Sequence, residues 1–262
     1  MRQSTPYKST LYLESEENPL KPIIENLHAR KSVRAFEDKS IPADIKQEIL
    51  LAAMAAPTAG NQQLYTILDI TDQTIKDRLT ITCDNQPFIA KAPMVLIFCA
   101  DVQKWFDAFV DSGCQPRLPG SGDFLLAVDD AVIAAQNAVT AAWSFGIGSC
   151  YIGDVMEQCE QHRALLNLPR YAFPAAMLVF GYPTQQQQQR PKPTRCDLQF
   201  IVHENVYRRL DGQILRKMFA KNIGDQTYET WFRAFCSRKY NSDFAREMSR
   251  SVDVYLRDFH DI

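Results

Sequence analysis

The chain has 262 residues, of which 46% are hydrophobic and 23% charged, with a net charge of −2 at pH 7. These values are typical of a soluble globular protein with a large core, and they argue against a general nucleic-acid or membrane-surface binder. No apolar run approaches the length of a membrane span, and the first twelve residues lack the apolar stretch of a signal peptide. We therefore expect a cytoplasmic protein.

Cysteine usage points to the same compartment. The seven cysteines are widely spaced, odd in number and without a C-x-x-C pair. A disulfide framework or a zinc site is therefore not expected, and the thiols should be reduced and largely buried.

The first part of the chain contains its most informative stretch. Residues 1–20 are polar and aperiodic, and we interpret them as an N-terminal arm. Residues 22–30 and 42–56 each begin with proline and have apolar side chains at helical spacing, which predicts two helices.

Between these helices lies the basic segment Arg30-Lys31-Ser32-Val33-Arg34-Ala35-Phe36. If it is extended, Val33 and Phe36 can point into a core while Arg30, Ser32 and Arg34 point the other way. Arginine and serine side chains bind phosphate through charge-assisted hydrogen bonds. A solvated basic turn is the alternative interpretation of this segment taken alone.

The middle of the chain alternates strands, helices and small-residue loops. Residues 64–70, 94–100 and 174–180 predict strands, and the last two are apolar enough to be covered on both faces. Residues 71–82 and 101–110 predict helices. The stretches 57–63 and 146–153 predict loops whose main chain a ligand can approach closely, with plain connections as the alternative.

Further helices are predicted downstream. Residues 123–145 form the longest helical pattern, apolar on most sides, so this helix should lie in a large core or an interface. Asp154 and Glu157 resemble a capping box that begins a helix running to about residue 166. Residues 185–189 are a glutamine-only connector with no reason to pack, 198–202 predict a short strand, and the aromatic-rich end from 205 on predicts amphipathic helices that cover the body or a partner subunit.

Together, the basic segment, the two small-residue loops and a second basic segment ending at Arg195 could hold a flat cofactor that carries a phosphate. The sequence has no Walker A motif, no G-x-G-x-x-G, no H-E-x-x-H and no G-x-S-x-G. A flavin fits these observations because it carries the redox chemistry itself, without a protein nucleophile or metal.

Residues 30–36 resemble the FMN-phosphate motif that opens the nitroreductase family of flavoproteins. Further landmarks follow in family order: 56–63, Gln86 before 90–93, 135–137, 146–153, 181–183 and 201–207. The last of these, with the helical tail, is most similar to oxygen-insensitive NAD(P)H nitroreductases and flavin reductases that carry a C-terminal extension. The resemblance implies an α+β fold with a central, mostly antiparallel sheet flanked by helices, in an intertwined homodimer. It divides the chain into an FMN-binding domain, 21–207, and a helical extension, 208–262.

The resemblance also implies a set of cofactor contacts, with no catalytic side chain and no metal. Four positions would contact the FMN phosphate and ribityl chain: Arg30, Lys31, Ser32 and Arg34. Gln86 would bind the polar edge of the ring, and Tyr151, Ile152 and Gly153 would face the ring near N5. The other subunit would contribute Pro57, Thr58, Ala59, Asn61 and Gln63. Arg195 matches the second phosphate segment, but Pro193 stands where the family has lysine, and Lys192 or Arg190 would substitute for it.

The implied activity is reduction of nitroaromatics, quinones or flavins by a ping-pong mechanism with NADH or NADPH as electron donor. The alternative is an FMN-binding storage or sensor protein with negligible turnover, which the altered second phosphate segment favours.

Overall fold

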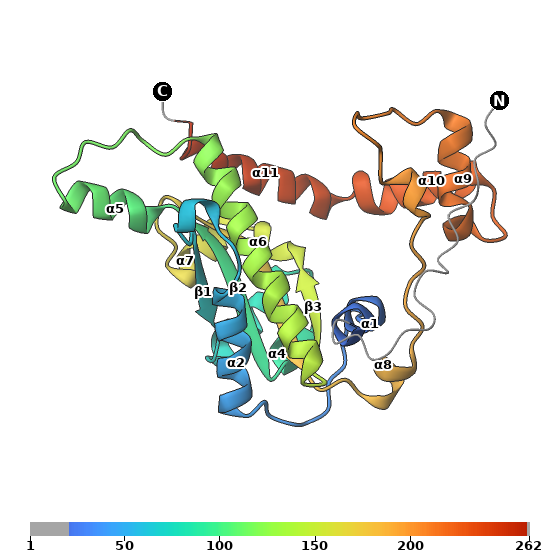
Figure 1. Ribbon diagram of the computed structural model, residues 1–262, viewed down its shortest axis with the longest axis horizontal. Coiled ribbons are helices and arrows are strands. Elements are labelled where there is room, and N and C mark those ends of the chain that lie inside the picture. Colours follow the sequence, from blue (N-terminus) through green and yellow to red (C-terminus); the bar gives the residue numbers. More distant parts are fainter. Residues whose placement is uncertain (1–20, 261–262) are drawn as a thin grey trace.

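The computed structural model describes residues 21–260, so the predicted N-terminal arm, 1–20, lies outside the described residues. An antiparallel four-stranded sheet in the order β1-β2-β4-β3 forms its centre (Figure 1). The strands are β1 (Tyr65–Asp69), β2 (Met94–Asp101), β3 (Gly148–Ile152) and β4 (Ala172–Gly181). Helices flank this sheet, which confirms the predicted α+β class.

The helices follow the predicted order. They are α1 (Lys21–Ala29), α2 (Ala43–Met54), α3 (Gln73–Thr82), α4 (Phe88–Lys91), α5 (Gln103–Asp111), α6 (Ser121–Ser144), α7 (Cys159–Leu166), α8 (Gln185–Gln189), α9 (Gly212–Ile223), α10 (Tyr228–Phe235) and α11 (Asp243–Arg257). Short helical turns are η1 (Ala59–Asn61), η2 (Gly153–Met156), η3 (Leu198–Phe200) and the π-helical turn η4 (Cys236–Tyr240).

The central strand β2 explains the layering. Its side chains alternate between two cores, as the two-residue period of a strand requires. Leu96 and Phe98 pack in the core that α2 and α6 cover, whereas Val95 and Ile97 pack in the core on the opposite face with α3 and α4. Every residue of β2 and β4 is buried, as their apolar runs predicted.

Helix α6 is the long predicted helix, and its two sides differ. A row of alanines lies at full burial against the sheet and α2, while Leu125 and Ile133 are 60% and 40% exposed. By length and composition α6 is also long and apolar enough to cross a membrane, which the sequence analysis did not anticipate; its packing within the fold is that of a core helix. Gly146 ends it with a φ of +72°, as expected for a residue after a helix terminus.

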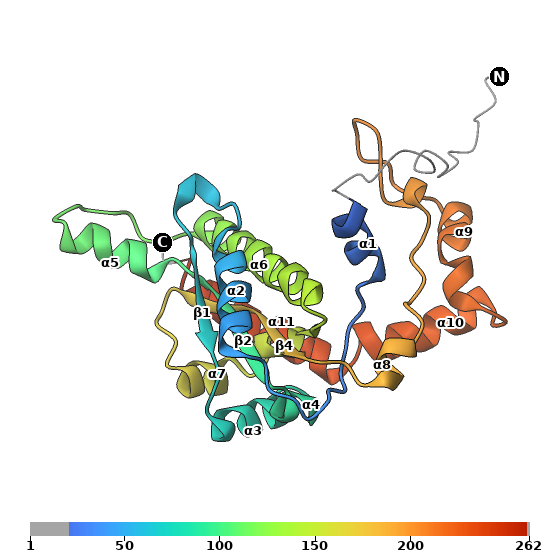
Figure 2. The same cartoon turned by 60° about the horizontal axis from the view of Figure 1, so that its bottom comes forward.

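The C-terminal extension has two parts (Figure 2). Helix α11 packs on α7 and η2, and Tyr255 and Phe259 enter the main core. Helices α9 and α10 lie apart from the sheet in both views, and they pack on each other through Phe219, Trp231 and Phe232. The predicted helical, aromatic-rich end is confirmed for the part of it that the structure describes.

Four local predictions were wrong. Most of the predicted loop 146–153 is strand β3, because its main chain pairs with β4. The expected helix from Asp154 is instead turn η2 followed by α7, since Gln158 adopts a φ of +50° and separates them. The glutamine connector forms the short helix α8, which the Thr184 side chain caps by accepting from the Gln187 N–H. The short strand expected over 198–202 is the turn η3.

Candidate active site

The basic segment Arg30–Phe36 runs extended along the edge strand β3. Ser32 pairs with Ser149 in a parallel bridge, and the Val33 N–H donates to the Ser149 carbonyl at 2.9 Å. Further along, Phe36 pairs with Pro183 just beyond β4. Val33 is 1% exposed and Phe36 packs against the core, so these two apolar residues anchor the segment.

Arg30 is the most informative side chain of this segment. Its Nε and one terminal nitrogen are buried, and neither has a hydrogen-bond partner within residues 21–260. Its guanidinium carbon lies 5.9 Å from the centre of the Tyr151 ring. A buried cationic donor without an acceptor is costly, and an anion with several acceptor oxygens, such as a phosphate, fits these donors.

Ser32 and Arg34 converge on the same place from the same side of the segment. Both lie close enough to the buried Cys150 thiol of β3 to influence its pKa, as does Arg30. Burial raises the pKa of Cys150, although these three neighbours act to lower it. Burial likewise raises the pKa of the Tyr151 hydroxyl to about 12, against the opposing effect of Arg30. Both groups are therefore neutral at pH 7.

Lys31 points elsewhere, and Arg190 and Lys192 of the second basic segment likewise bond to main-chain carbonyls. The Lys31 amine donates to the carbonyls of Gln188 (2.6 Å) and Arg190, and Arg190 in turn donates to the Ser32 carbonyl at 2.7 Å. Lys192 donates to main-chain carbonyls at the end of α1. Arg195 is exposed and makes no hydrogen bond or ion pair with the described part of the chain.

Gln86 lies beside the end of β3, next to Asp154. Its amide nitrogen donates to the Cys83 carbonyl and to Oδ2 of Asp154, both at 2.9 Å. Asp154 follows Gly153, which is exposed at the start of η2. Because Gln86 uses both amide hydrogens in these bonds, it keeps its side-chain oxygen as an acceptor. The sequence analysis named Asp154 only as a helix cap and missed this contact.

Carboxyl groups gather behind this edge. Asp84 and Glu157 lie beside Asp154, and all three offer oxygens within 4.8 Å of one another. Burial, and then the neighbouring carboxylates, raises the pKa of Glu157 to about 8.

The loop 57–63 is held by a residue that the sequence analysis did not identify. Asp130 of α6 is buried and accepts from the main-chain N–H groups of Ala59 at 2.9 Å and Leu64 at 3.0 Å. Thr58 accepts from the Gln63 N–H at 3.1 Å. Pro57, Asn61 and Gln63 are exposed. The sequence gives little signal for this role, because α6 carries other polar residues, among them the neighbouring Asp129.

This loop does not lie beside the basic segment of its own chain. It leads into β1, whereas the segment lies along β3, and these strands are the opposite edges of the sheet. Three strand spacings, about 14 Å, separate two such edges. The described residues thus bring Arg30, Ser32, Arg34, Gln86 and the 151–153 stretch to one side and leave the 57–63 loop on the other.

Comparison with known proteins found a matching family model and similar proteins. A family model described as the nitroreductase family matches residues 27–182. An oxygen-insensitive NADPH nitroreductase of Salmonella typhimurium is 31% identical over 76% of this chain and 80% of its own. An NADPH-dependent FMN reductase of Bacillus subtilis is 27% identical over 90% and 95%. The solved structure of the NADPH:FMN oxidoreductase from Vibrio harveyi, in complex with NAD⁺, superposes with a TM-score of 0.75 at 26% identity, covering 89% of this chain and 97% of that one.

Proposed function

The chain belongs to the nitroreductase family, and on this basis we propose that it is an FMN-dependent oxidoreductase that takes electrons from NAD(P)H and passes them to a small-molecule acceptor. The relatives' names support this proposal, since they specify FMN reductase and NADPH nitroreductase. The observation that carries it in this chain is the buried pair of partnerless nitrogens on Arg30, beside Ser32 and Arg34.

In the proposed site, Arg30, Ser32 and Arg34 hold the FMN phosphate and ribityl chain. Gln86 presents its side-chain oxygen to the polar edge of the ring, and residues 151–153 line the ring with main-chain groups. Bound FMN would supply hydride transfer at N5, so no protein nucleophile is needed. The Lys31 amine bonds to carbonyls in this structure, and Arg195 is exposed. Their inclusion in the set therefore rests on the family resemblance alone.

The site is proposed to be completed by a second copy of the chain. The loop residues Pro57, Thr58, Ala59, Asn61 and Gln63 are proposed to reach the flavin of the partner subunit. Two features support a homodimer: the loop lies at the opposite sheet edge from the basic segment, and α6 exposes leucine and isoleucine side chains. Large exposed apolar patches mark association surfaces.

We propose that the protein is located in the cytoplasm.

We propose that the donor and the acceptor occupy the same flavin face in turn, which is ping-pong behaviour. The acceptor class is nitroaromatics, quinones or free flavins. Burial raises the pKa of both titratable side chains beside Arg30, Cys150 and Tyr151, so they are neutral at pH 7. The protein's part is therefore to bind and orient both partners while excluding water.

The test is anaerobic stopped-flow reduction of the FMN-loaded protein by NADPH and NADH separately, followed by mixing with a nitroaromatic or a quinone. The proposal expects bleaching of the flavin absorbance by at least one nucleotide and recovery of that absorbance on addition of acceptor. Tight FMN binding with negligible bleaching by either nucleotide would instead identify a storage or sensor protein. Failure to bind FMN would reject both.

A further inference from the structure

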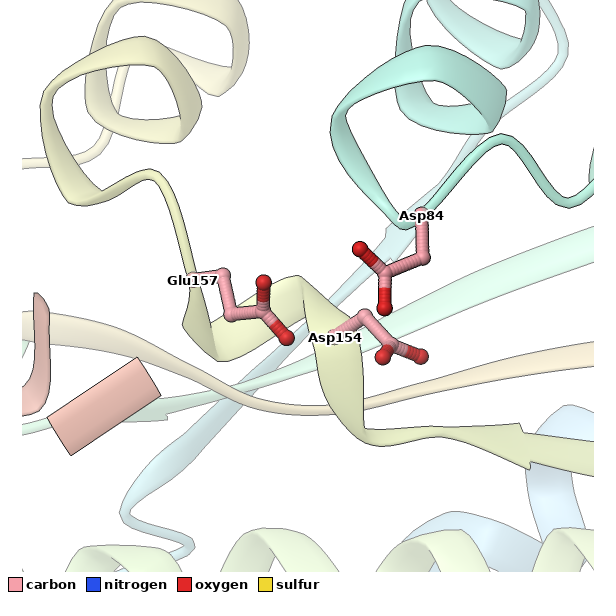
Figure 3. Close-up of side chains that lie close together, drawn as sticks. All are labelled: Asp84, Asp154 and Glu157. Carbon is pink, nitrogen blue, oxygen red and sulfur yellow. The ribbon is translucent and has the colours of Figure 1, made fainter. Parts of the chain in front are cut away.

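A cluster of three carboxyl groups lies where α3, β3 and η2 meet. Asp84 follows α3, whereas Asp154 and Glu157 come from η2 and the residue after it, and their side chains point toward one another (Figure 3). One ligand oxygen from each lies within 4.8 Å of the other two. Asp84 and Asp154 are close enough for a hydrogen bond between their side chains. Because ionised carboxylates only accept hydrogen bonds, this approach is favourable only when a proton or a cation is shared between them.

Glu157 adds an independent observation. Glu157 is 2% exposed. Its Oε1 is buried and has no hydrogen-bond partner in the part of the chain that the structure describes. The charged groups that act on it are all carboxylates: Asp84, Asp154 and Glu247 of α11. The cation nearby, Lys239 of η4, acts on Asp84 instead. Burying a carboxylate oxygen that faces two further carboxylates and has no hydrogen-bond donor costs folding free energy unless a cation joins the three groups.

The surrounding side chains restrict the kind of cation. His162, packed against η2, uses one ring nitrogen on the Val155 carbonyl at 2.9 Å and the other on the Thr82 hydroxyl at 2.8 Å, so neither nitrogen is available to a metal. The ligand set is therefore oxygen only, which suits hard divalent cations.

The oxygen spacing restricts its size. Two oxygens on one ion lie no further apart than twice the metal–oxygen distance, about 4.2 Å for Mg²⁺ and about 4.6–5.2 Å for Ca²⁺. No two of these oxygens are more than 4.8 Å apart, so the cluster admits Ca²⁺ without movement of the chain. Mg²⁺ suits it less, because Mg²⁺ demands near-ideal octahedral geometry and gives up its waters reluctantly.

We propose that Asp84, Asp154 and Glu157 form a binding site for a divalent cation of the size of Ca²⁺, with water completing the coordination on the exposed Asp84 side. The ion ties the end of α3 to η2, directly behind the Gln86–Asp154 contact. This site is distinct from the basic segment that binds anions, and it does not depend on the proposed oxidoreductase activity.

The test is calorimetric titration of the EDTA-treated, full-length, FMN-loaded protein with CaCl₂ and, separately, with MgCl₂. The wild type should bind one Ca²⁺ per chain saturably and bind Mg²⁺ more weakly. Glu157→Gln keeps the shape of the side chain but cannot ionise to a carboxylate ligand, and it should weaken Ca²⁺ binding by at least about tenfold, as should Asp84→Asn. The exposed Asp111→Asn on α5 is the matched control and should bind Ca²⁺ like the wild type.

Thermal unfolding supplies a readout that is independent of flavin chemistry. Saturating Ca²⁺ should raise the melting temperature of the wild type and of Asp111→Asn, but not that of Glu157→Gln. Absence of saturable Ca²⁺ binding at millimolar concentration, or binding that Glu157→Gln leaves unchanged, would overturn the proposal. In that case a proton on Glu157 is what neutralises the cluster.

Discussion

Val33 occupies the space that any side chain at residue 148 would need: a Cβ placed on Gly148 would stand 2.5 Å from Cγ2 of Val33. Gly181 has the same relation to Phe36, whose ring atoms would lie 2.7 Å from an added Cβ. These two glycines let the basic segment lie directly against β3 and the end of β4. The position of the side chains that we propose to bind the FMN phosphate therefore depends on glycine at both residues.

Gly148→Ala should displace the basic segment. Overpacking of this kind costs about 1–3 kcal/mol in unfolding free energy, and FMN retention should fall with it. Denaturant unfolding and the flavin content of purified protein measure both effects. Gly122→Ala is the control, since nothing lies within 4 Å of a Cβ there, and it should not destabilise the protein. The double variant with Val33→Ala should recover part of the flavin content; no recovery would show that the clash is not the cause.

Arg30→Ala and Arg34→Ala should each weaken FMN binding. Loss of a charge-assisted contact to phosphate costs about 1.5–3 kcal/mol, which corresponds to roughly tenfold to a hundredfold in affinity. Arg30→Ala should have the larger effect, because its buried nitrogens have no other partner among the described residues. The measurement is flavin retained after dialysis, with the exposed Arg257→Ala as control. Retention equal to that of the wild type in both variants would reject the phosphate assignment.

Cys150→Ser should leave the chemistry intact. Burial raises the pKa of this thiol, so it is not a thiolate at pH 7, and catalytic thiols require the thiolate. Flavin reduction by NAD(P)H and turnover of a quinone should both stay close to wild type. Normal reduction with turnover about a hundredfold lower, the scale of a lost catalytic group, would show that the thiol takes part.

Charge placed on the exposed side of α6 should break the proposed dimer. Ile133→Glu puts a carboxylate on a surface that we assign to the partner subunit, and desolvating it there is unfavourable. Sedimentation should show monomer and the flavin should be lost, since the 57–63 loop of the partner would be missing. Ile81→Glu, on the likewise exposed Ile81 of α3, is the control and should stay dimeric. A wild-type monomer that still holds FMN would contradict the assignment.

Arg250 should stabilise the C-terminal extension in a pH-dependent way. It pairs with Glu160 of α7 and Glu247 of α11, and its hydrogen bonds lower the pKa of each carboxyl from 4.5 to about 2. The unfolded chain then binds more protons than the folded one between these values, so this stabilisation is complete above pH 4.5 and disappears as the pH falls through 2. Arg250→Ala should have a lower free energy of unfolding in urea than the wild type at pH 6, and this difference should shrink toward pH 2. A difference of constant size would exclude linkage to these carboxyls.

The sequence by itself determined the elements whose signal is local. The continuous apolar runs of β2 and β4 predicted strands covered on both faces, and the long alanine-rich pattern predicted a helix in a core or an interface. The basic segment was identified by residue type, because only a few side chains suit a phosphate.

The tertiary structure decided the parts that depend on distant partners. Strand β3 consists largely of small residues with no strong strand signal, and it becomes a strand because β4 lies beside it. Asp130 and Asp154 gain their roles only when the fold brings them to the 57–63 loop and to Gln86. Lys31 belongs to the basic segment in sequence, yet its amine turns to the carbonyls of 188 and 190. Spacing along the chain does not predict these contacts, since each joins residues that become neighbours only after the sheet has formed.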